Sequence, residues 1–498
     1  MQSPTPKNLK ALTVASAALM LLSGCGSSSM NSNSIAGTSP AAAPMVVTVS
    51  DAPLGNILSA RVTLSAVSLG SSATGSTPVS VLSSPVTVEL SGLGAVQEPI
   101  EISSLANGTY NSVTLTVSAA TVVYTNSSGQ VTTATATLAS PTVTVPLSPS
   151  LTVNSNAELQ LQLAFNLAQS FSITGSTVTF TPAINTTGAQ VGSESSGDRQ
   201  VEVTGNVVST TPSSIVVQSG DSGKQFTFTI NSSTQLPSGV ALTSIVQGDI
   251  VQVQGQTQTD GSILATSITL ESGQASAGQD QSGAKGIILS VNSSSGTITG
   301  FTMLPREDFG SGLSGSAGSL TVNLASTTSF ALPEDALNAG LTASSFGIAD
   351  LFPGESVIVS GSLSGTTGNP VIAATQIMLA AESIPATLNT AVTGTAPNLS
   401  FTIGISVPSF LTTYGQMVTL NVSTSSATEY GNGLTQSTFA ALATGASIEV
   451  HGYLLQTSPG TFQLYATKIA QIETPETPEG GDGSGSSGGS SGGSSGDN

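Results

Sequence analysis

Residues 158–167 read ELQLQLAFNL, and this stretch decides the fold class of the chain. Large apolar side chains stand at every second position, and mostly polar residues stand between them. Successive side chains of a β-strand point to opposite faces, so the alternation predicts a half-buried strand with one face on a core.

The same alternation recurs throughout residues 45–186. Turn pairs separate the apolar runs, at Asn107-Gly108, Ser128-Gly129 and Thr174-Gly175. Many short strands with frequent turns predict an antiparallel β-sandwich-like domain at 45–186. The stretch 98–105 is the place where we expect a short turn instead of a strand. The predicted strands are 45–50, 60–69, 86–90, 111–117, 121–125, 158–167 and 177–184.

The second half of the chain contains a weak internal repeat. In each copy a glycine precedes a strand pattern, a second glycine follows seven residues later, and another strand pattern comes after it. The glycine pairs are Gly248/Gly255, Gly354/Gly361 and Gly445/Gly452. About five strands per copy predict three small β-barrels, at 200–272, 284–382 and 386–473. The chain is therefore expected to be all-β.

Composition excludes several classes of function. Of the 498 residues, 8 are Lys or Arg and 27 are Asp or Glu, a formal net charge of −19. Nucleic-acid binding needs clustered Lys and Arg, so we expect no nucleic-acid partner. One His and one Cys cannot form a His/Cys metal cluster within one chain, and no cofactor is expected.

The N-terminus has the pattern of a processing segment. Lys7 and Lys10 precede an apolar run at 11–22, which is too short to span a bilayer. Leu22-Ser-Gly-Cys25 follows, and this motif resembles the lipobox of bacterial lipoproteins. The resemblance implies that residues 1–24 are a signal peptide and that lipid is attached to Cys25. An ordinary secretory signal with a chance cysteine is the alternative.

The expected lipid on Cys25 predicts that the protein is attached to a membrane of the cell envelope. The neutral Gly26 and Ser27 after the cysteine favour, by the same resemblance, the outer membrane or cell surface of a bacterial envelope. Residues 25–44 are small and polar and predict a flexible tether. The Gly/Ser-rich stretch 474–498 cannot build a core and predicts a disordered tail.

Two family resemblances cover most of the body. VTVSDAP at 47–53, LANGTYNSVTLTVSAATVVY at 105–124 and FTPAI at 180–184 resemble the domain of unknown function 4382. The three repeats resemble the domain of unknown function 5666, which follows the first family in bacterial lipoproteins. Neither resemblance implies catalytic residues.

Two short segments fit the letters of known functional motifs, but the sequence around each lacks the structural context that the motif requires. GSGLSG at 310–315 fits a dinucleotide loop, but a strand pattern follows it where a helix is required. GSSGG at 485–489 fits a nucleophile elbow, but it lies in the predicted tail. The charged run Arg306-Glu307-Asp308 is expected to be a solvated cluster in a loop.

Two single residues are candidates for a site. His451 is the only histidine, and it alternates with Val450, so we expect it on the wet face of a strand, where Gln is tolerated. Asp51 is expected in the turn before Pro53, where its carboxylate bonds the turn backbone. A calcium role for Asp51 is the alternative, although the chain contains no EF-hand loop motif.

These observations favour a lipid-anchored envelope protein without enzymatic activity, acting in adhesion, matrix assembly or scaffolding. Its expected partners are the membrane, through lipid on Cys25, and an envelope protein or polysaccharide. The alternative is a surface or periplasmic protein that binds a glycan or a peptide in a cleft of the first domain. A pocket lined by converging polar groups would favour the alternative.

Overall fold

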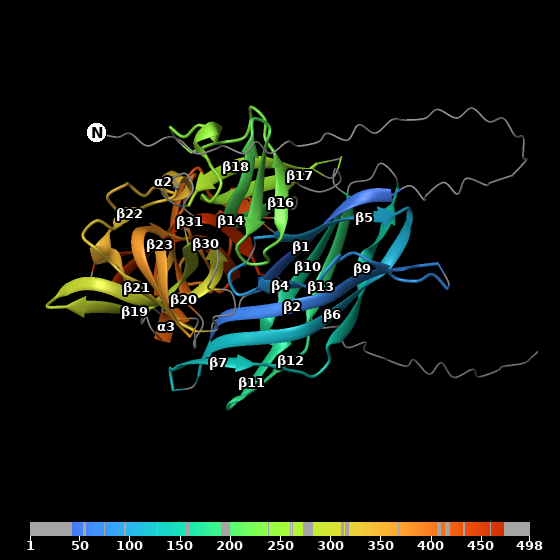
Figure 1. The fold of residues 1–498 in the computed structure, drawn as a ribbon, viewed down its shortest axis with the longest axis horizontal. Helices are drawn as coiled ribbons and strands as arrows, with labels where there is room; N and C mark the ends of the chain where they lie inside the picture. The colour runs from blue at the N-terminus through green and yellow to red at the C-terminus, as the bar shows by residue number, and fades with distance from the viewer. Residues whose placement is uncertain are drawn as a thin grey trace, which may run out of the picture. The chain divides into compact units, whose positions relative to one another are not determined.

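The computed structural model describes most of the chain between residues 42 and 472, in which strands dominate (Figure 1). All contacts given below lie within one unit, residues 40–498. The described residues are 42–52, 56–73, 75–93, 96–126, 128–154, 159–190, 200–237, 239–258, 260, 262–271, 282–309, 313, 318–366, 368–405, 410–413, 419–431, 434–458 and 460–472.

The N-terminal part is a β-sandwich built around one core cluster. One sheet has the order β13 (Ile184–Gln190), β10 (Leu159–Asn166), β1 (Ala42–Ala52), β5 (Glu98–Ala106). The other has the order β3 (Val79–Ser80), β2 (Ile57–Ser71), β6 (Gly108–Thr125), β7 (Val131–Thr135), with β4 (Val86–Glu89) paired to β2 and β9 (Thr142–Val153) paired to β6. A smaller sheet joins β11 (Phe171–Thr174), β12 (Thr177–Phe180) and β8 (Thr137–Leu138).

Strand β10 carries the apolar face that its sequence predicts. Leu159, Leu161, Leu163 and Phe165 are all buried in the sandwich core. The strand ends at Asn166, whose side chain caps the short helix α1 (Leu167–Ser170) by accepting a hydrogen bond from the Gln169 N–H. β10 pairs with β1 in parallel and with β13 antiparallel.

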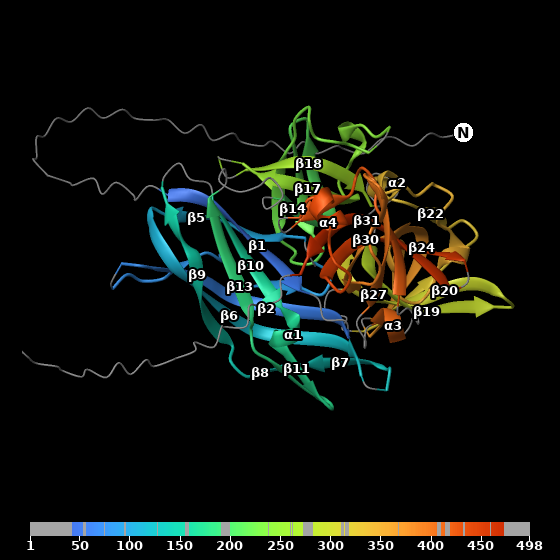
Figure 2. The same cartoon turned by 180° about the vertical axis from the view of Figure 1, so that it is seen from behind.

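Local boundaries in the sandwich differ from three expectations. The patterns 111–117 and 121–125 belong to one strand, β6, which pairs with β2 across several register shifts (Figures 1 and 2). The stretch 98–105, expected as a turn, is strand β5, because it pairs with β1. Ala42–Pro44, assigned to the tether, also pair with β5 and so extend β1.

The second half contains three rings of five strands with one common strand order. In the first barrel, the ring runs β14–β15–β16–β18–β17 and back to β14. The corresponding rings are β19–β20–β21–β24–β23 and β25–β27–β28–β31–β30, each closed by the additional pairings. In every ring the third and fifth strands pair in parallel, and a short helix precedes the fourth strand. Small five-stranded barrels of this kind are the OB-fold class.

The bounds of these elements are as follows. The first barrel has β14 (Gln200–Thr211), β15 (Ser214–Ser219), β16 (Gln225–Thr229), η2 (Leu242–Ser244), β17 (Ile250–Thr257) and β18 (Ile263–Leu270). The second has β19 (Ser282–Ser294), β20 (Thr297–Phe309), β21 (Leu320–Asn323), β22 (Ser329–Ala331), α2 (Glu334–Asn338), η3 (Ile348–Asp350), β23 (Ser356–Thr366) and β24 (Asn369–Leu379). The third has β25 (Glu382–Leu388), β26 (Thr393–Thr395), β27 (Asn398–Ile405), α3 (Phe410–Thr413), β28 (Thr419–Ser423), β29 (Glu429–Gly431), α4 (Gln436–Ala440), β30 (Ser447–Ser458) and β31 (Thr461–Gln471).

The repeated glycine pair has a structural cause in each barrel. The first glycine adopts a positive φ before the fourth strand, 93° at Gly248, 109° at Gly354 and 92° at Gly445. The second glycine lies where the fourth strand shifts its register against the fifth. There the partner backbone comes so close that a Cβ on Gly452 would lie 2.2 Å from the Tyr465 carbonyl oxygen.

The sandwich and the barrels contact one another through small apolar clusters. Leu58 and Val123 of the sandwich are buried with Ile287 and Leu304 of the second barrel. Ile250 of the first barrel is buried in a cluster with residues of the second barrel, among them Phe309, Ile358 and Met378. The rings of Phe352 and Phe462, from the second and third barrels, lie 5.1 Å apart.

Candidate functional site

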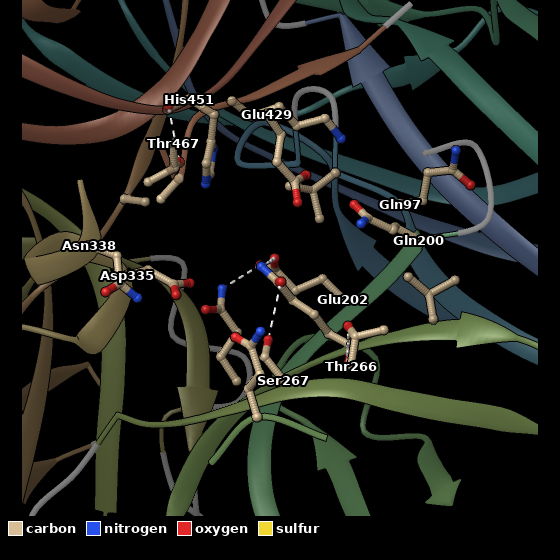
Figure 3. Close-up of a pocket in the computed structure, with 18 of the residues that line it drawn as sticks. Gln97, Gln200, Glu202, Thr266, Ser267, Asp335, Asn338, Glu429, His451 and Thr467 are labelled. Atoms are coloured by element: carbon tan, nitrogen blue, oxygen red, sulfur yellow. Dashed lines mark hydrogen bonds between the residues drawn. The ribbon is translucent and has the colours of Figure 1, made fainter. Parts of the chain in front are cut away.

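A cavity of about 500 Å³ lies where the first and third barrels face each other (Figure 3). Strands β14, β17 and β18 of the first barrel form one wall, and β29, β30 and β31 of the third barrel form the opposite wall. Helix α2 of the second barrel and residues 96–97 of the sandwich close two further sides. A volume of this size is typical of sites for small molecules.

Equivalent positions of the two barrels face the cavity. In the first barrel, Gln254 is in register with Glu202 on one side and Ser267 on the other. In the third barrel, the same three positions are His451, Ser383 and Lys468. Of these six residues, only Ser383 does not line the cavity. The period of the strands places all six opposite the barrel cores.

Amide side chains dominate the lining. They come from the sandwich and from the first two barrels, five of them from the first barrel, and lie at Gln97, Gln200, Gln235, Gln252, Gln254, Gln256 and Asn338. The Nε2 atoms of Gln252 and Gln254 donate hydrogen bonds to the two carboxylate oxygens of Glu202, at 2.5 and 3.2 Å. Ser267 Oγ in turn donates to Gln254 Oε1 at 3.2 Å. An amide offers two donors and an acceptor, so this lining can bind hydroxyl groups in either role.

Three carboxyl groups and one amine also line the cavity. Glu202, Asp335 and Glu429 supply the carboxyls, and Lys468 supplies the amine. Burial raises the pKa of Glu202, and the charge of Lys285 opposes that shift. Burial also raises the pKa of Asp335, and the negative charges of Glu334 and Glu429 raise it further. The lining is therefore richer in acid than in base.

His451 is not on a wet face, although its register is the expected one. Val450 points into the core, and His451 is only partly exposed on the cavity wall. Its Nδ1 atom lies 2.9 Å from Ser383 Oγ. Burial, together with the charges of Lys285 and Lys468, lowers the pKa of His451 to about 3. The expectation of a solvated histidine is wrong because the first barrel covers this face.

The Ser383–His451 contact is a serine–histidine pair that the sequence did not reveal. A general base works best when its pKa lies near the operating pH, and a pKa of about 3 makes His451 a poor one. The equivalent positions of the first barrel, Glu202 and Gln254, are also joined by a cross-strand hydrogen bond between their side chains. The pair therefore has the geometry of a structural contact.

A second group of charges lies beside the cavity, between the sandwich and the first two barrels. Glu89, Glu98, Asp221 and Glu307 line a small pocket there with Lys285 and Arg306. Lys285 Nζ lies 3.0 Å from Glu307 Oε1. Burial raises the pKa of Glu98 to about 7, and the charge of Glu307 raises it further.

The expected solvated loop at 306–308 is thus wrong. Arg306, Glu307 and Asp308 lie within strand β20, and none of them is fully exposed. Gly220 of the first barrel accepts a backbone hydrogen bond from the Asp308 N–H at 3.3 Å. The run is a strand because it pairs with β19 of the same barrel, where Lys285 lies opposite Glu307 and Ala284 opposite Asp308.

The remaining candidates do not join the cavity. Asp51 is buried within strand β1, opposite Phe165 of β10, and not in a turn. Among the described residues, no group of three His, Cys, Asp or Glu side chains is placed to hold a metal ion. Cys25, the signal segment, the C-terminal stretch 474–498 and most of the glycine-rich motif at 310–315 lie outside the described residues.

The sequence contains one signal for the cavity that no single candidate residue carries. Gln252, Gln254 and Gln256 stand at alternate positions of the first anchor strand. Period 2 places them on one face of β17, opposite the buried Val251 and Val253. A row of amides on one strand face is a candidate binding surface, but only the packing of the barrels shows what lies opposite.

The comparisons with known families agree with the two halves of the fold. Residues 42–182 match the family described as Domain of unknown function (DUF4382). Residues 204–269 and 407–470 match Domain of unknown function (DUF5666). The chain carries a DUF4382 domain followed by DUF5666 domains. The second barrel falls between the two DUF5666 matches and repeats their strand order.

Solved structures add only distant likenesses. The wild-type single-stranded DNA binding protein from Thermus aquaticus is 13% identical, over 40% of this chain and 96% of that chain, with a TM-score of 0.16. The Drosophila Unr CSD456 structure is 11% identical, over 55% of this chain and 98% of that chain, with a TM-score of 0.13. Scores this low carry no argument about this DUF4382–DUF5666 chain. No curated protein matches it.

One further observation concerns membranes. Within the described ranges, none of the helices has the length and apolar character needed to cross a bilayer.

Proposed function

We propose that this protein is a non-enzymatic binding protein of the bacterial envelope, and that its ligand is a small saccharide bound in the cavity between the barrels. The observation that carries the proposal is the convergence of seven amide side chains on one cavity of about 500 Å³. Sugar hydroxyls both donate and accept hydrogen bonds, and neutral amide side chains can complement both roles.

The cavity favours ligand binding over a purely structural role. A spacer or scaffold needs only convex, featureless barrels, whereas polar groups from four parts of this protein face one space. The lack of Trp argues against an open aromatic platform for sugars. A polar cavity with walls from several parts of the protein can hold a sugar from more than one side, and Tyr453 supplies one buried ring in its lining.

The location in the envelope rests on the sequence alone. The LSGC motif around Cys25 supports a lipid anchor, and the neutral Gly26 and Ser27 that follow it favour the outer membrane or cell surface. Under this proposal the lipid keeps the binding cavity at the envelope, where polysaccharides are present. Adhesion to an envelope polysaccharide would use the same cavity.

Isothermal titration calorimetry on the full chain tests the binding function. Neutral mono- and disaccharides are titrated against wild type, Gln256→Ala and the control Gln225→Ala, whose exposed amide lies on β16 outside the cavity. Losing one amide–hydroxyl hydrogen bond weakens binding roughly 2- to 10-fold. We expect that loss for Gln256→Ala and no change for Gln225→Ala. Binding of short peptides but of no saccharide would contradict the proposal.

A further inference from the structure

The three carboxyl groups of the cavity differ in their hydrogen-bond partners within the protein. Both oxygens of Glu202 accept hydrogen bonds, from Gln252 and from Gln254. Asp335 is on helix α2 of the second barrel, and Glu429 is on β29 of the third. In Figure 3 both side chains point into the same space from different walls. These two carboxyls are therefore the ones placed to meet a ligand.

The two carboxyls repel each other in the absence of a ligand. The negative charge of Glu429 is one of the causes that raise the pKa of Asp335. A positive group between them would relieve this repulsion and gain attraction from both. His451 cannot supply that charge, because its pKa of about 3 leaves it neutral at ordinary pH. Lys468 lies in register with Glu429 on the neighbouring strand, and its one amine faces three carboxyls in the lining, which therefore stays acidic.

Other features of the molecule indicate which kind of positively charged group would bind between the two carboxyls. No described group of three acidic or histidine side chains is placed to hold a metal ion, so an inorganic ion lacks a ligand set here. The many amides can hydrogen-bond hydroxyl groups on the same ligand. The net charge of −19 attracts cations towards the protein and repels anionic sugars.

We infer that the cavity takes an amine-bearing saccharide, whose protonated amine lies between Asp335 and Glu429. This inference rests on the proposed function and specifies the class of its ligand. The amides of β14 and β17 bind the hydroxyls on the opposite side of the sugar. N-acetylation of the amine would remove the positive charge and add bulk where the two carboxyls meet.

Three disaccharides that differ at one functional group test the inference. Chitobiose carries free amines, its N,N′-diacetyl form carries amides, and cellobiose carries hydroxyls at the same positions. Each is titrated calorimetrically into the full chain. We expect chitobiose to bind at least 10-fold more tightly than the other two, and its affinity to fall as salt is added. Equal or tighter binding of cellobiose overturns the inference but leaves the proposed function standing.

Two matched variants test whether the Asp335 carboxylate causes the preference for chitobiose over cellobiose. Asp335→Asn keeps the shape of the side chain and is expected to remove most of the preference for chitobiose over cellobiose. Asp260→Asn removes an exposed charge far from the lining and is expected to preserve it. An unchanged preference in Asp335→Asn would overturn the assigned position of the amine. Failure of all three sugars to bind folded wild type would overturn both proposals.

Discussion

Arg306 on β20 donates a hydrogen bond of 2.9 Å from its Nε atom to the carbonyl oxygen of Leu58 on β2, and so joins the second barrel to the sandwich. Arg61 reciprocates with a 2.7 Å hydrogen bond from its guanidinium to the Arg306 carbonyl oxygen. The other described cations also lie where parts of the protein meet. Lys224 pairs with Glu101 at 3.0 Å, and Lys285 and Lys468 line the two pockets. The few described Lys and Arg side chains therefore lie at contacts between the sandwich and the barrels or between barrels.

We expect Arg306→Met to loosen the contact between the sandwich and the second barrel. Loss of a charged donor to a partly buried carbonyl costs about 1–3 kcal/mol. Lys224→Met removes a more exposed ion pair, for which about 0–1 kcal/mol is expected. Chemical denaturation of both variants gives the comparison. A larger loss for Lys224→Met than for Arg306→Met would contradict this ranking.

Stability should fall as the pH rises from 6.5 to 8.0. Burial raises the pKa of Glu98 and Glu382 to about 7 and that of Glu271 to about 8. These carboxyls bind more protons in the folded than in the unfolded chain, so rising pH favours unfolding, by about 1 kcal/mol per group over this window. His451 acts in the opposite sense, but only below its ordinary pKa of 6.5.

Denaturant titrations at the two pH values measure this slope. Glu271→Gln should reduce it by about 1 kcal/mol, because the amide does not ionise. Asp260→Asn should leave it unchanged, since hydrogen bonds from Ser262 lower the pKa of the exposed Asp260 and keep it ionised at both pH values. A wild-type stability that rises over this pH window would show that these carboxyls are not buried as described.

The register-shift glycines should not tolerate a side chain. Alanine at Gly452 places a Cβ 2.2 Å from the Tyr465 carbonyl oxygen, and the same distance separates a Cβ on Gly361 from the Ala373 oxygen. Relief of such an overlap costs about 1–3 kcal/mol. Gly368→Ala is the control, because a Cβ there meets nothing within 4 Å. Equal unfolding midpoints for Gly452→Ala and Gly368→Ala would refute this explanation.

Proteolytic nicking should leave the protein assembled. We predict first cuts at 187–199 and 273–283, as the sequence of these polar joints indicates. Strand β13 extends to Gln190 and β19 starts at Ser282, so cuts are expected between these strands and their neighbours. Contacts such as Glu101–Lys224 and Leu58–Arg306 should hold the fragments together on gel filtration. Rapid cutting within 247–270, with both joints protected, would oppose this prediction.

The lipid anchor has its own test. Cys25→Ala should block lipidation and lipoprotein-type cleavage, because the proposed attachment atom is its sulfur. Incorporation of radioactive palmitate is measured in the variant and in wild type. More than one acyl chain is expected on wild type, because a single chain anchors a protein only weakly. Equal labelling of both proteins would place the anchor elsewhere.

Several elements could be predicted from the sequence because their causes are local. The alternation at 159–165 predicts a strand face, and the face is buried as predicted. The glycine pairs predict three barrels, because positive φ and close backbone approach each demand glycine at one position. The turn glycines at 129 and 175 also adopt positive φ between paired strands.

The candidate site could not be predicted in the same way. Period 2 correctly places His451 and Gln254 opposite the barrel cores, but it cannot tell water from a neighbouring barrel. Arg306, Glu307 and Asp308 resemble a solvated loop because their partners, such as Leu58 and Gly220, lie far away in the sequence.

The sequence by itself determined the all-β class, the buried face of strands such as β10 and the glycine positions where the chain must bend, because backbone sterics and side-chain period act over a few residues. It did not reveal the strands at 98–105 and 306–308, which form by pairing with β1 and β19. Only the tertiary structure decided that the polar faces of the first and third barrels enclose a cavity with Asp335. The reason is physical: the burial and pKa of a polar side chain depend on the surface that packs against it, and here that surface lies many residues away in the chain.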